Sequence, residues 1–201
     1  MINEILAHAD DPLEDAIELY NPTAESVDLS GWWLSNARYD LQRFRIPAGT
    51  ILLPDGYVVF YRYRFDPDFN DLAPNFTLNR VRGDEIYLSQ TDSLGRLTGF
   101  RAVEDFGPAE DRVSFGRYES STGPQFPALG QRTFGADTPA SVDEFRSGLG
   151  GPNASPRVGP VVINEIMYHP PDLGTNDNFR DEYLELHNIT AEPVPLFDPN
   201  H

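Results

Sequence analysis

The sequence lacks cysteine, so neither a disulfide framework nor a thiolate metal site is available to it. It has no apolar run of about 18 residues, the length that a transmembrane helix needs, and we expect no membrane insertion. Met1 leads directly into a β-rich segment, without the basic and apolar regions of a signal peptide. Helical periodicity is almost absent, whereas 18 prolines and 16 glycines are spread along the chain. This composition favours short strands joined by many turns.

Basic residues are scarce, with 15 against 32 acidic residues and a formal net charge of -17. A surface of that sign repels the phosphates of nucleic acids and of anionic lipids, so we expect no nucleic-acid partner. The hydrophobic share is 39% and includes 13 Phe, 9 Tyr and 2 Trp. The chain therefore has enough apolar residues for a folded core and is not a disordered acidic tail.

One short pattern occurs twice in the chain. Residues 2–8 read I-N-E-I-L-A-H, and residues 163–169 read I-N-E-I-M-Y-H. A second pair of segments, residues 18–25 and residues 185–192, matches in the same order. The offset is 161 in the first pair and 167 in the second, so the loop between the two matches is six residues longer in the second copy. Two matches in one order, separated by a loop of variable length, indicate a duplicated domain.

The duplication predicts how the chain is organised. Residues 1–136 form one complete copy, and residues 137–160, rich in Pro, Gly, Ser and Ala, form a linker. Residues 161–201 supply only the first strands of a second copy. Because that copy stops at His201, we expect the sequence to be part of a larger protein, in which the missing signal peptide is uninformative.

Short apolar segments with a turn signal about every 8 to 12 residues predict an all-β antiparallel sandwich of about nine short strands. Strict alternation along residues 2–6 places Asn3 and Ile5 on one face and the other three residues on the opposite face. Residues 84–103 are predicted to form a β-hairpin. A helix of one or two turns is expected near residues 142–146.

A set of short motifs follows in one order along the first part of the chain: I-N-E-I at the start and residues 18–22, 27–32, 34–35, 44–47, 53–57, 83–88 and 114–117. Their order resembles that of the lamin tail domain in its bacterial form. The resemblance covers residues 1–136 and, as a truncated second copy, residues 161–198. It implies an immunoglobulin-like β-sandwich, found in bacteria mostly in long exported multi-domain proteins, and hence an extracellular or cell-surface location. The family has no catalytic residues to carry over.

The repeated motif offers two interpretations, a metal site or a structural role. Along a strand, Glu4 and His8 share a face but lie about 13 Å apart, so one ion reaches both only if the chain turns between them. We therefore interpret the motif as structural, because Asn and Glu at the start of a strand satisfy neighbouring polar groups. The polar residues concerned are Asn3, Glu4 and His8 in the first copy and Asn164, Glu165 and His169 in the second.

One acidic loop has the oxygen-ligand spacing of a calcium site. Its candidate ligands are Asp66, Asp68, Asn70 and Asp71. Asp71 stands where an EF-hand needs Gly, and Thr77 stands where it needs Glu, so we predict a generic calcium site and not an EF-hand. Two other loops, residues 10–15 and residues 176–182, are similarly acidic, and for all three the alternative is a solvated loop tip.

Catalytic signatures are missing from the sequence. It has no G-x-S-x-G elbow, no phosphate-binding glycine loop and no H-E-x-x-H pattern, so we predict that the protein is not an enzyme. The predicted function is that of a structural or interaction module of a larger exported bacterial protein, which spaces, anchors or presents neighbouring domains. The alternatives are a calcium-stabilised adhesion or carbohydrate-binding domain and an accessory domain that targets an attached hydrolase.

The expected partners follow from this function. They are another protein, a cell-surface polysaccharide, or neighbouring domains of the same chain. The truncated copy adds a further expectation, because it cannot close a sandwich of its own. It is expected to be mobile, to pack on the first copy, or to self-associate with another copy of the chain.

Overall fold

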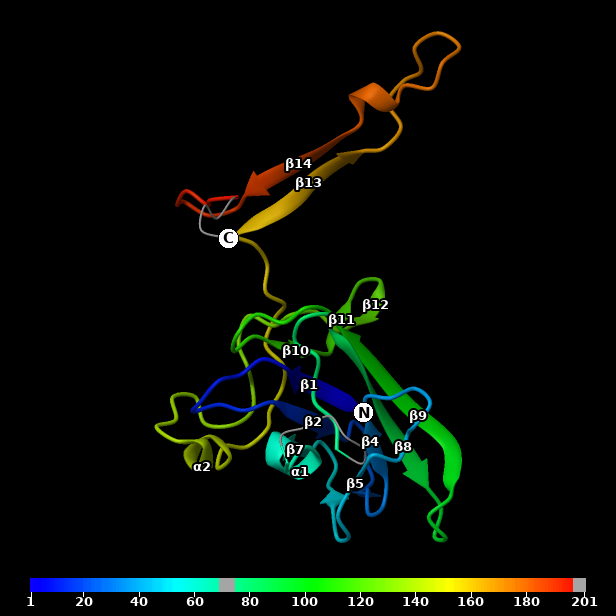
Figure 1. Ribbon diagram of the computed structural model, residues 1–201, viewed down its shortest axis with the longest axis vertical. Helices are drawn as coiled ribbons and strands as arrows, with labels where there is room; N and C mark the ends of the chain where they lie inside the picture. Colours follow the sequence, from blue (N-terminus) through cyan, green and yellow to red (C-terminus); the bar gives the residue numbers. More distant parts are fainter. Residues whose placement is uncertain (69–74, 197–201) are drawn as a thin grey trace. The chain divides into compact units, whose positions relative to one another are not determined.

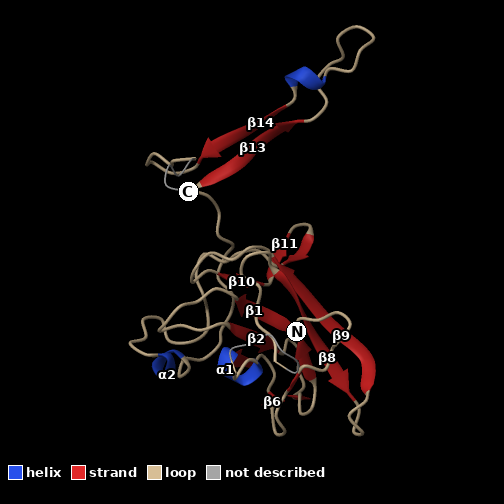
Figure 2. Cartoon of the chain, in the orientation of Figure 1, coloured by secondary structure: helices blue, strands red, loops and turns tan. Residues whose placement is uncertain are grey.

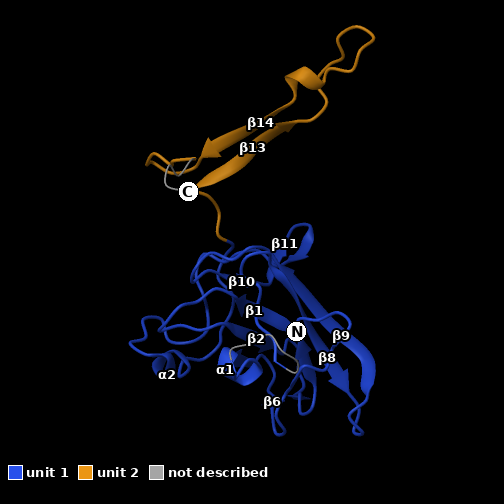
Figure 3. Cartoon of the chain, viewed as in Figure 1, with its two compact units in different colours: residues 1–156 blue, residues 157–201 orange. Residues whose placement is uncertain are grey.

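Strands account for nearly all regular structure in the computed structural model, which describes residues 1–68 and 75–196 (Figure 2). The helices are short: α1 (Arg62–Phe65), α2 (Val142–Phe145) and the 3-10 helix η1 (Phe179–Asp181). None of the helices in the described part of the chain is long and apolar enough to cross a membrane. The chain divides into two compact units, residues 1–156 and residues 157–201 (Figure 3).

The first unit contains two four-stranded sheets (Figure 1). Their strand orders are β10-β1-β2-β7 and β5-β4-β8-β9, and the paired strands are antiparallel. The first sheet consists of β1 (Ile2–Leu6), β2 (Ala16–Tyr20), β7 (Tyr57–Tyr61) and β10 (Ser114–Gly116). The second consists of β4 (Trp33–Ser35), β5 (Phe44–Arg45), β8 (Asp84–Thr91) and β9 (Leu97–Phe106). Two small ribbons pair β3 (Val27–Asp28) with β6 (Ile51–Leu52) and β11 (Tyr118–Ser120) with β12 (Gly123–Gln125).

Both sheets contribute to one apolar core. Ile5 and Ile17 from the first sheet and Leu34, Ile86 and Leu88 from the second are buried in the same cluster. Burying these side chains stabilises the fold by about 25 cal/mol for each Å² of apolar surface removed from water. The predicted all-β antiparallel sandwich is confirmed, as are the hairpin formed by β8 and β9 and the short helix α2.

A β-bulge corrects the predicted faces of the first strand. The register between β1 and β2 shifts between Ile2 and Glu4. A bulge inserts one extra residue into a strand, which reverses the alternation beyond it. Ile2 and Ile5 therefore both lie in the core between the sheets, whereas Leu6 belongs to a second apolar cluster that contains Phe145. The prediction that Ile2 and Ile5 occupy opposite faces is wrong.

The structure also differs from the predicted linker. Residues 137–156 belong to the first unit, where α2 buries Phe145 completely. Arg146, which follows α2, forms an ion pair with Glu14 at 2.5 Å. The helix starts at Ser141, whose Oγ accepts a hydrogen bond from the backbone N–H of Glu144, as a helix N-cap does. Its Pro- and Gly-rich composition predicted a linker, but the segment has an apolar anchor and packs on β1 and β2. We call residues 133–153 the covering segment.

The second unit contains one antiparallel hairpin, formed by β13 (Val161–Met167) and β14 (Tyr183–Asn188). Each residue of β14 is exposed. An isolated two-stranded hairpin is marginally stable in water, because it buries little apolar surface. The described part of the second unit thus has regular backbone pairing but no core of its own.

Candidate functional site

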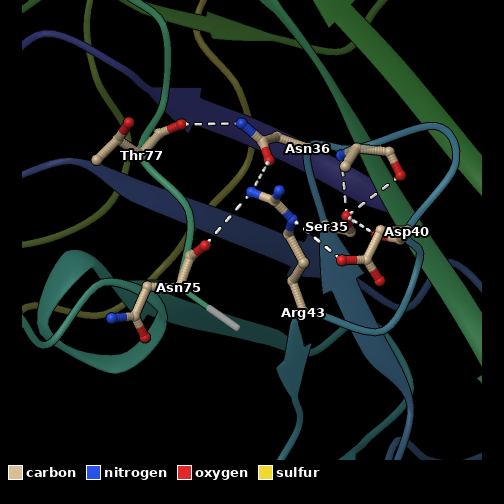
Figure 4. Close-up of polar contacts among 7 residues, drawn as sticks. Ser35, Asn36, Asp40, Arg43, Asn75 and Thr77 are labelled. Atoms are coloured by element: carbon tan, nitrogen blue, oxygen red, sulfur yellow. Dashed lines mark hydrogen bonds and ion pairs between the residues drawn. The ribbon is translucent and has the colours of Figure 1, made fainter. Parts of the chain in front are cut away.

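The loop after β4 is held in place by polar side chains (Figure 4). The amide of Asn36 donates to the carbonyl of Thr77 at 3.0 Å and accepts from Arg43 Nη1 at 3.2 Å. The same Arg43 nitrogen donates to the carbonyl of Asn75 at 3.3 Å. Arg43 Nε also lies 3.6 Å from a carboxylate oxygen of Asp40. These contacts tie residues 36–43 to the segment that precedes β8, so the loop has a defined conformation.

The Ser35 side chain closes the turn within the same loop. Its hydroxyl donates to the carbonyl of Asp40 at 2.5 Å and accepts from the backbone N–H of Ala37 at 2.9 Å. Ser35 itself is buried as the last residue of β4. The turn therefore begins on a rigid strand and projects the residues between Ala37 and Asp40 outward.

A second turn, residues 79–83, lies next to this loop. The Oδ1 atom of Asn79 accepts from the backbone N–H groups of Val81 and Arg82 at 3.1 and 3.0 Å. Gly83 has a φ of 80°, and a Cβ atom there would lie 2.0 Å from the carbonyl oxygen of Phe106. Only glycine fits this close approach of two backbones. The end of the turn is consequently fixed against β9.

Both turns expose a large apolar side chain next to an arginine. Tyr39 is 94% exposed and Val81 is 73% exposed. Arg38 and Arg82 line one shallow cleft, and the Arg38 guanidinium lies 5.8 Å from the centre of the Tyr39 ring. Tyr and Arg are enriched among the residues that dominate binding energy at interfaces. We call Arg38, Tyr39, Val81 and Arg82 the loop surface.

The loop surface lies beside a cleft that carries side chains of both charges. The cleft is also lined by the carboxylates of Asp84, Glu85 and Asp105. The sequence has 15 Lys and Arg residues, and every one of them is Arg, which binds carboxylates in a planar, bidentate manner. Sequence reasoning did not single out the loop surface, because four residues from two turns form no spacing pattern along the chain. The available signal was the string Arg38-Tyr39 between the polar turn residues Asn36 and Asp40.

The Asn and Glu of the repeated motif lie in a buried polar cluster in the first unit. Glu4 accepts hydrogen bonds from the backbone N–H of Thr133 at 3.1 Å and from the hydroxyl of the same residue. Asn3 donates from Nδ2 to Glu18 at 2.6 Å and to Asn153 at 2.9 Å. Asn153 donates in return to the backbone carbonyl of Asn3 at 2.9 Å. The cluster attaches the covering segment to β1 and β2, which is a structural arrangement.

Burial dominates the electrostatics of this cluster. It raises the pKa of Glu4 above its usual range and raises the pKa of Glu18 to about 8, although a hydrogen bond from Asn3 acts in the opposite direction on Glu18. A carboxyl group with a pKa near 8 is mostly protonated at neutral pH, so Glu18 is held there without a full buried charge. Perturbed carboxyl groups often mark active sites, but here both side chains are enclosed and packed against the fold.

Each histidine of the repeated motif lies beside two carboxylates. His8 has a ligand atom within 4.8 Å of Asp10 and Asp111, and His169 has one within 4.8 Å of Asp172 and Asp177. His8 also donates from Nδ1 to the carbonyl of Ala109 at 2.9 Å. The Glu4 side chain instead points into the buried cluster, so Glu4 and His8 do not share an ion. The sequence could not pair His8 with Asp111, because the two residues are more than 100 positions apart.

The predicted calcium loop is only partly described. Asp66 is buried, and its carboxylate accepts hydrogen bonds from two nitrogens of Arg62, each at 2.9 Å. Asp68 is exposed and accepts from the side-chain amide of Asn75 at 3.1 Å. Asn70 and Asp71 lie outside the described residues. The carboxylate of Asp66 is thus bound by a guanidinium, and the calcium site at this loop stays a prediction.

An apolar pocket of about 240 Å³ lies at one end of the core. Trp32 and Phe100 line it with their rings 5.6 Å apart, together with Leu19, Leu29 and Leu88. The residues that line the pocket include no carboxylate, histidine or arginine. It offers space for an apolar group, and the hydroxyl of Tyr20, a lining residue, donates to Asp55 at 2.8 Å.

Sheet order, shared core and rigid loops define an immunoglobulin-like β-sandwich of the kind that serves structural and interaction roles. The family model of the Lamin Tail Domain matches residues 1–98, so this part of the chain is a lamin tail domain. The predicted family is therefore confirmed over residues 1–98, and the truncated second copy stays a prediction. Neither a search of curated proteins nor a search of solved structures found a match.

Proposed function

We propose that the first unit is a non-catalytic interaction module that binds a protein partner through the loop surface. The observation that carries this proposal is the exposure of Tyr39 on a loop whose backbone is fixed by partly buried hydrogen bonds. A rigid aromatic anchor loses little conformational entropy on binding, which favours affinity. The lamin tail family, whose members are immunoglobulin-like structural and interaction domains, supports a role of this kind.

The bacterial form of the family also supports a proposed location. We propose that the protein acts outside the cell or at its surface, where the module spaces, anchors or presents neighbouring domains. The net charge of -17 keeps such a surface soluble and steers it towards partners with basic patches.

Site-specific photocrosslinking tests the proposed surface. A photoreactive phenylalanine placed at position 39 is expected to crosslink a protein from an extract of the cell surface. The matched control places the same residue at position 118, where Tyr118 is 38% exposed on β11. We expect the adduct from position 39 and none of the same mass from position 118. Tyr39→Ala and Arg82→Ala should each weaken binding of the identified partner by roughly 10-fold or more.

Two outcomes of that experiment would contradict the proposal. One is a partner that crosslinks equally at both positions. The other is a partner whose dissociation constant is unchanged by Tyr39→Ala and by Arg82→Ala. A circular dichroism melt of each variant shows that the fold is intact, since both side chains are exposed and make no core contact.

A second candidate function is cation-dependent adhesion, which the two histidine clusters favour over the predicted calcium loop. Histidine nitrogen with carboxylate oxygen suits zinc or manganese better than calcium, which prefers oxygen ligands alone. A site occupied at 100 times its Kd adds about 2.7 kcal/mol, or roughly 5–10 °C in melting temperature. The melt is run after chelation, with zinc, manganese or calcium. A shift that His8→Gln abolishes would support this candidate, and no shift with any of the three ions would refute it.

A further inference from the structure

The apolar pocket at the end of the core is built by elements from the whole first unit. Its volume is about 240 Å³, and both four-stranded sheets and the β3–β6 ribbon contribute to its walls. Leu19 comes from β2 in the first sheet, and Leu88 and Ala102 come from β8 and β9 in the second. Val27 and Leu52 come from the ribbon. The pocket therefore belongs to the interior of the sandwich.

Aliphatic side chains form the buried part of the wall. Each of the four leucines that line the pocket is at most 5% exposed, and all belong to the main core cluster. An engineered apolar cavity of about 150 Å³ binds benzene, so by proportion a pocket of 240 Å³ holds roughly ten carbon atoms. The leucines are Leu19, Leu29, Leu52 and Leu88.

Two aromatic residues complete the wall. Trp32 is 8% exposed and belongs to the core, whereas Phe100 is 52% exposed and lies at the boundary with solvent. The ring centres are 5.6 Å apart and the ring planes are inclined by 59°. Strand β8 lies between β4 and β9, so this contact reaches across β8. Because the two rings are not parallel, they form no slot in which a third flat ring stacks on both.

The backbone beside each aromatic residue has an unusual conformation. Trp32 follows Gly31, whose φ is 78°, and Phe100 follows Gly99, whose φ is 93°. Residues with a Cβ atom rarely adopt this region, so glycine permits both turns of the chain. The two rings are thus placed by the local backbone and not only by packing.

The pairing of β8 with β9 is also interrupted beside Phe100. The register shifts there, so that Gln90 stands opposite residues 98–100. The Thr98 hydroxyl donates to the side chain of Gln90 at 2.7 Å and accepts from the backbone N–H of Phe100 at 3.3 Å. Bulges of this kind redirect side chains and are common next to functional sites. This irregularity directs Phe100 towards the pocket.

The polar side chains around the pocket are engaged within the fold. Asn21 Nδ2 donates to the carbonyl of Leu52 at 3.0 Å, and its Oδ1 accepts from the hydroxyl of Thr23 at 2.7 Å. The hydroxyl of Tyr20 donates to Asp55, as described above. A charged group buried in this lining would lose its hydration without gaining an ion pair, which is costly. The part of a ligand that enters the pocket is therefore hydrocarbon.

We propose that this pocket binds an alkyl chain of about eight to ten carbon atoms, carried by a neutral amphiphile. The polar end of the amphiphile stays in solvent beside Phe100. Aliphatic walls and the inclined aromatic rings favour a flexible chain over a flat ring system. The net charge of -17 disfavours an anionic head group. The pocket shares no residue with the loop surface, and the proposal does not depend on the proposed function.

The two tryptophans provide an internal control for a direct test. Trp32 lines the pocket and Trp33 does not, because neighbouring residues of a strand point to opposite faces. In ¹⁵N-labelled protein, octyl glucoside below its micelle concentration should shift the indole N–H resonance of Trp32 and leave that of Trp33 in place. Trp33→Phe assigns the two resonances.

The same titration defines the contradictory results. Methyl glucoside has the same head group without the chain and should shift neither resonance. Equal shifts of Trp32 and Trp33, or no shift of Trp32 with octyl glucoside, would overturn the proposal. A shift of Trp32 by methyl glucoside would also overturn it, because the head group would then be the ligand.

Chain length tests the predicted size of the ligand. From hexyl to octyl glucoside the Kd should fall at least about 10-fold, since each buried methylene adds to the transfer free energy. From decyl to dodecyl glucoside it should fall less than about 3-fold, because the pocket is then full. A Kd that falls equally per methylene across the whole series would indicate adsorption to an open surface and would contradict a pocket of this volume.

A pair of variants on one strand tests the position of the site. Ala102→Leu enlarges a side chain of the wall and should weaken octyl glucoside binding at least about 10-fold, because it fills part of the space. The control Val103→Leu enlarges the neighbouring side chain, which is 43% exposed and outside the lining, and should leave the Kd unchanged. A thermal melt checks both folds. Equal Kd values for the two folded variants would contradict the proposal, and the tests on the unaltered chain decide it if Ala102→Leu does not fold.

Sedimentation with vesicles separates the two sources of such a chain, a free amphiphile and a lipid in a bilayer. Phosphatidylcholine vesicles are neutral and carry longer chains than octyl glucoside. If the protein pellets with them and Ala102→Leu reduces the pelleted fraction, the chain belongs to a lipid. If the protein stays in the supernatant while octyl glucoside shifts Trp32, the ligand is a free amphiphile. Pelleting that Ala102→Leu leaves unchanged would contradict lipid binding through this pocket.

Discussion

The two hairpins of this protein share a sequence motif, a register, a bulge and a turn, yet one is buried and the other is exposed. Their comparison separates what local sequence specifies from what the surrounding fold contributes. Asn21 and Asn188 close the same hydrogen-bonded turn in both environments, so the turn requires only residues within four positions. Burial differs because it depends on strands that are distant in sequence. We therefore expect the effect of a substitution on the free energy of unfolding to depend on how deeply the residue is buried. The hairpin geometry, which is the same in both copies, should not determine it.

The largest effect is expected from removing matched leucines. Leu19→Ala should lower the free energy of unfolding of the first unit by about 2–5 kcal/mol, because it leaves a cavity in the core. Leu186→Ala should change that free energy by less than about 0.5 kcal/mol, since Leu186 is half exposed and outside the first unit. Urea unfolding monitored by tryptophan fluorescence reports on the first unit, which contains Trp32 and Trp33. If the two substitutions lowered the free energy of unfolding equally, the difference in burial between the hairpins would have no energetic consequence.

A smaller effect is expected from the matched asparagines. Asn3→Ala should lower the free energy of unfolding of the first unit by about 1–3 kcal/mol, because Glu18 and Asn153 lose a buried hydrogen-bond partner. Asn164→Ala should leave the free energy of unfolding of the first unit unchanged, because the hydrogen bond from Asn164 to Glu185 is exposed. The same urea titration measures both variants. A loss of more than 1 kcal/mol in Asn164→Ala would mean that the second unit stabilises the first.

A third effect concerns pH. The folded pKa of Glu18, about 8, lies above its ordinary value of 4.5, so the folded state holds its proton more tightly than the unfolded state. The stability that this provides is fully present below pH 4.5 and is lost as the pH rises to 8. Between pH 5 and 8 the melting temperature should therefore fall, and Glu18→Gln should make that fall smaller.

Glu185→Gln is the control for this pH dependence. Its side chain is exposed in the second unit, so the melting temperature of the first unit should follow the parent at every pH. Calorimetric melts at unit pH intervals provide the comparison. A parent protein whose melting temperature is flat over this range would show that Glu18 is not protonated in the fold.

The sequence was sufficient to predict the class of fold and the family, because both rest on the order of local patterns. Apolar segments between turn residues predicted the sandwich, and the hairpin of residues 84–103 was found from its central turn. The bulge at Asn3 was not predicted, because a bulge depends on the register with β2 and β10 and leaves the residue types unchanged. The packing of Phe145 was missed for a similar reason, since a single aromatic residue in a Pro- and Gly-rich stretch gives no periodicity.

The candidate site was less predictable than the fold. The structural role assigned to the repeated motif stays a prediction; Asn3 and Glu4 lie in a buried polar cluster with Thr133 and Asn153, which are far along the chain. The loop surface and the pairing of His8 with Asp111 arise only when distant turns meet. Asp66 shows the opposite case, in which a spacing typical of calcium ligands coincides with a local ion pair to Arg62.

Hydrogen exchange on the protein tests the central claim most directly. The claim is that the repeated motif specifies the hairpin but that only a surrounding sandwich stabilises it. We expect amides of β1 and β2 to exchange only through global unfolding, and amides of β13 and β14 to exchange at least about 100-fold faster, through local opening. Equal and strong protection of both hairpins would contradict the claim, because the second hairpin would then be stable without the strands that enclose the first.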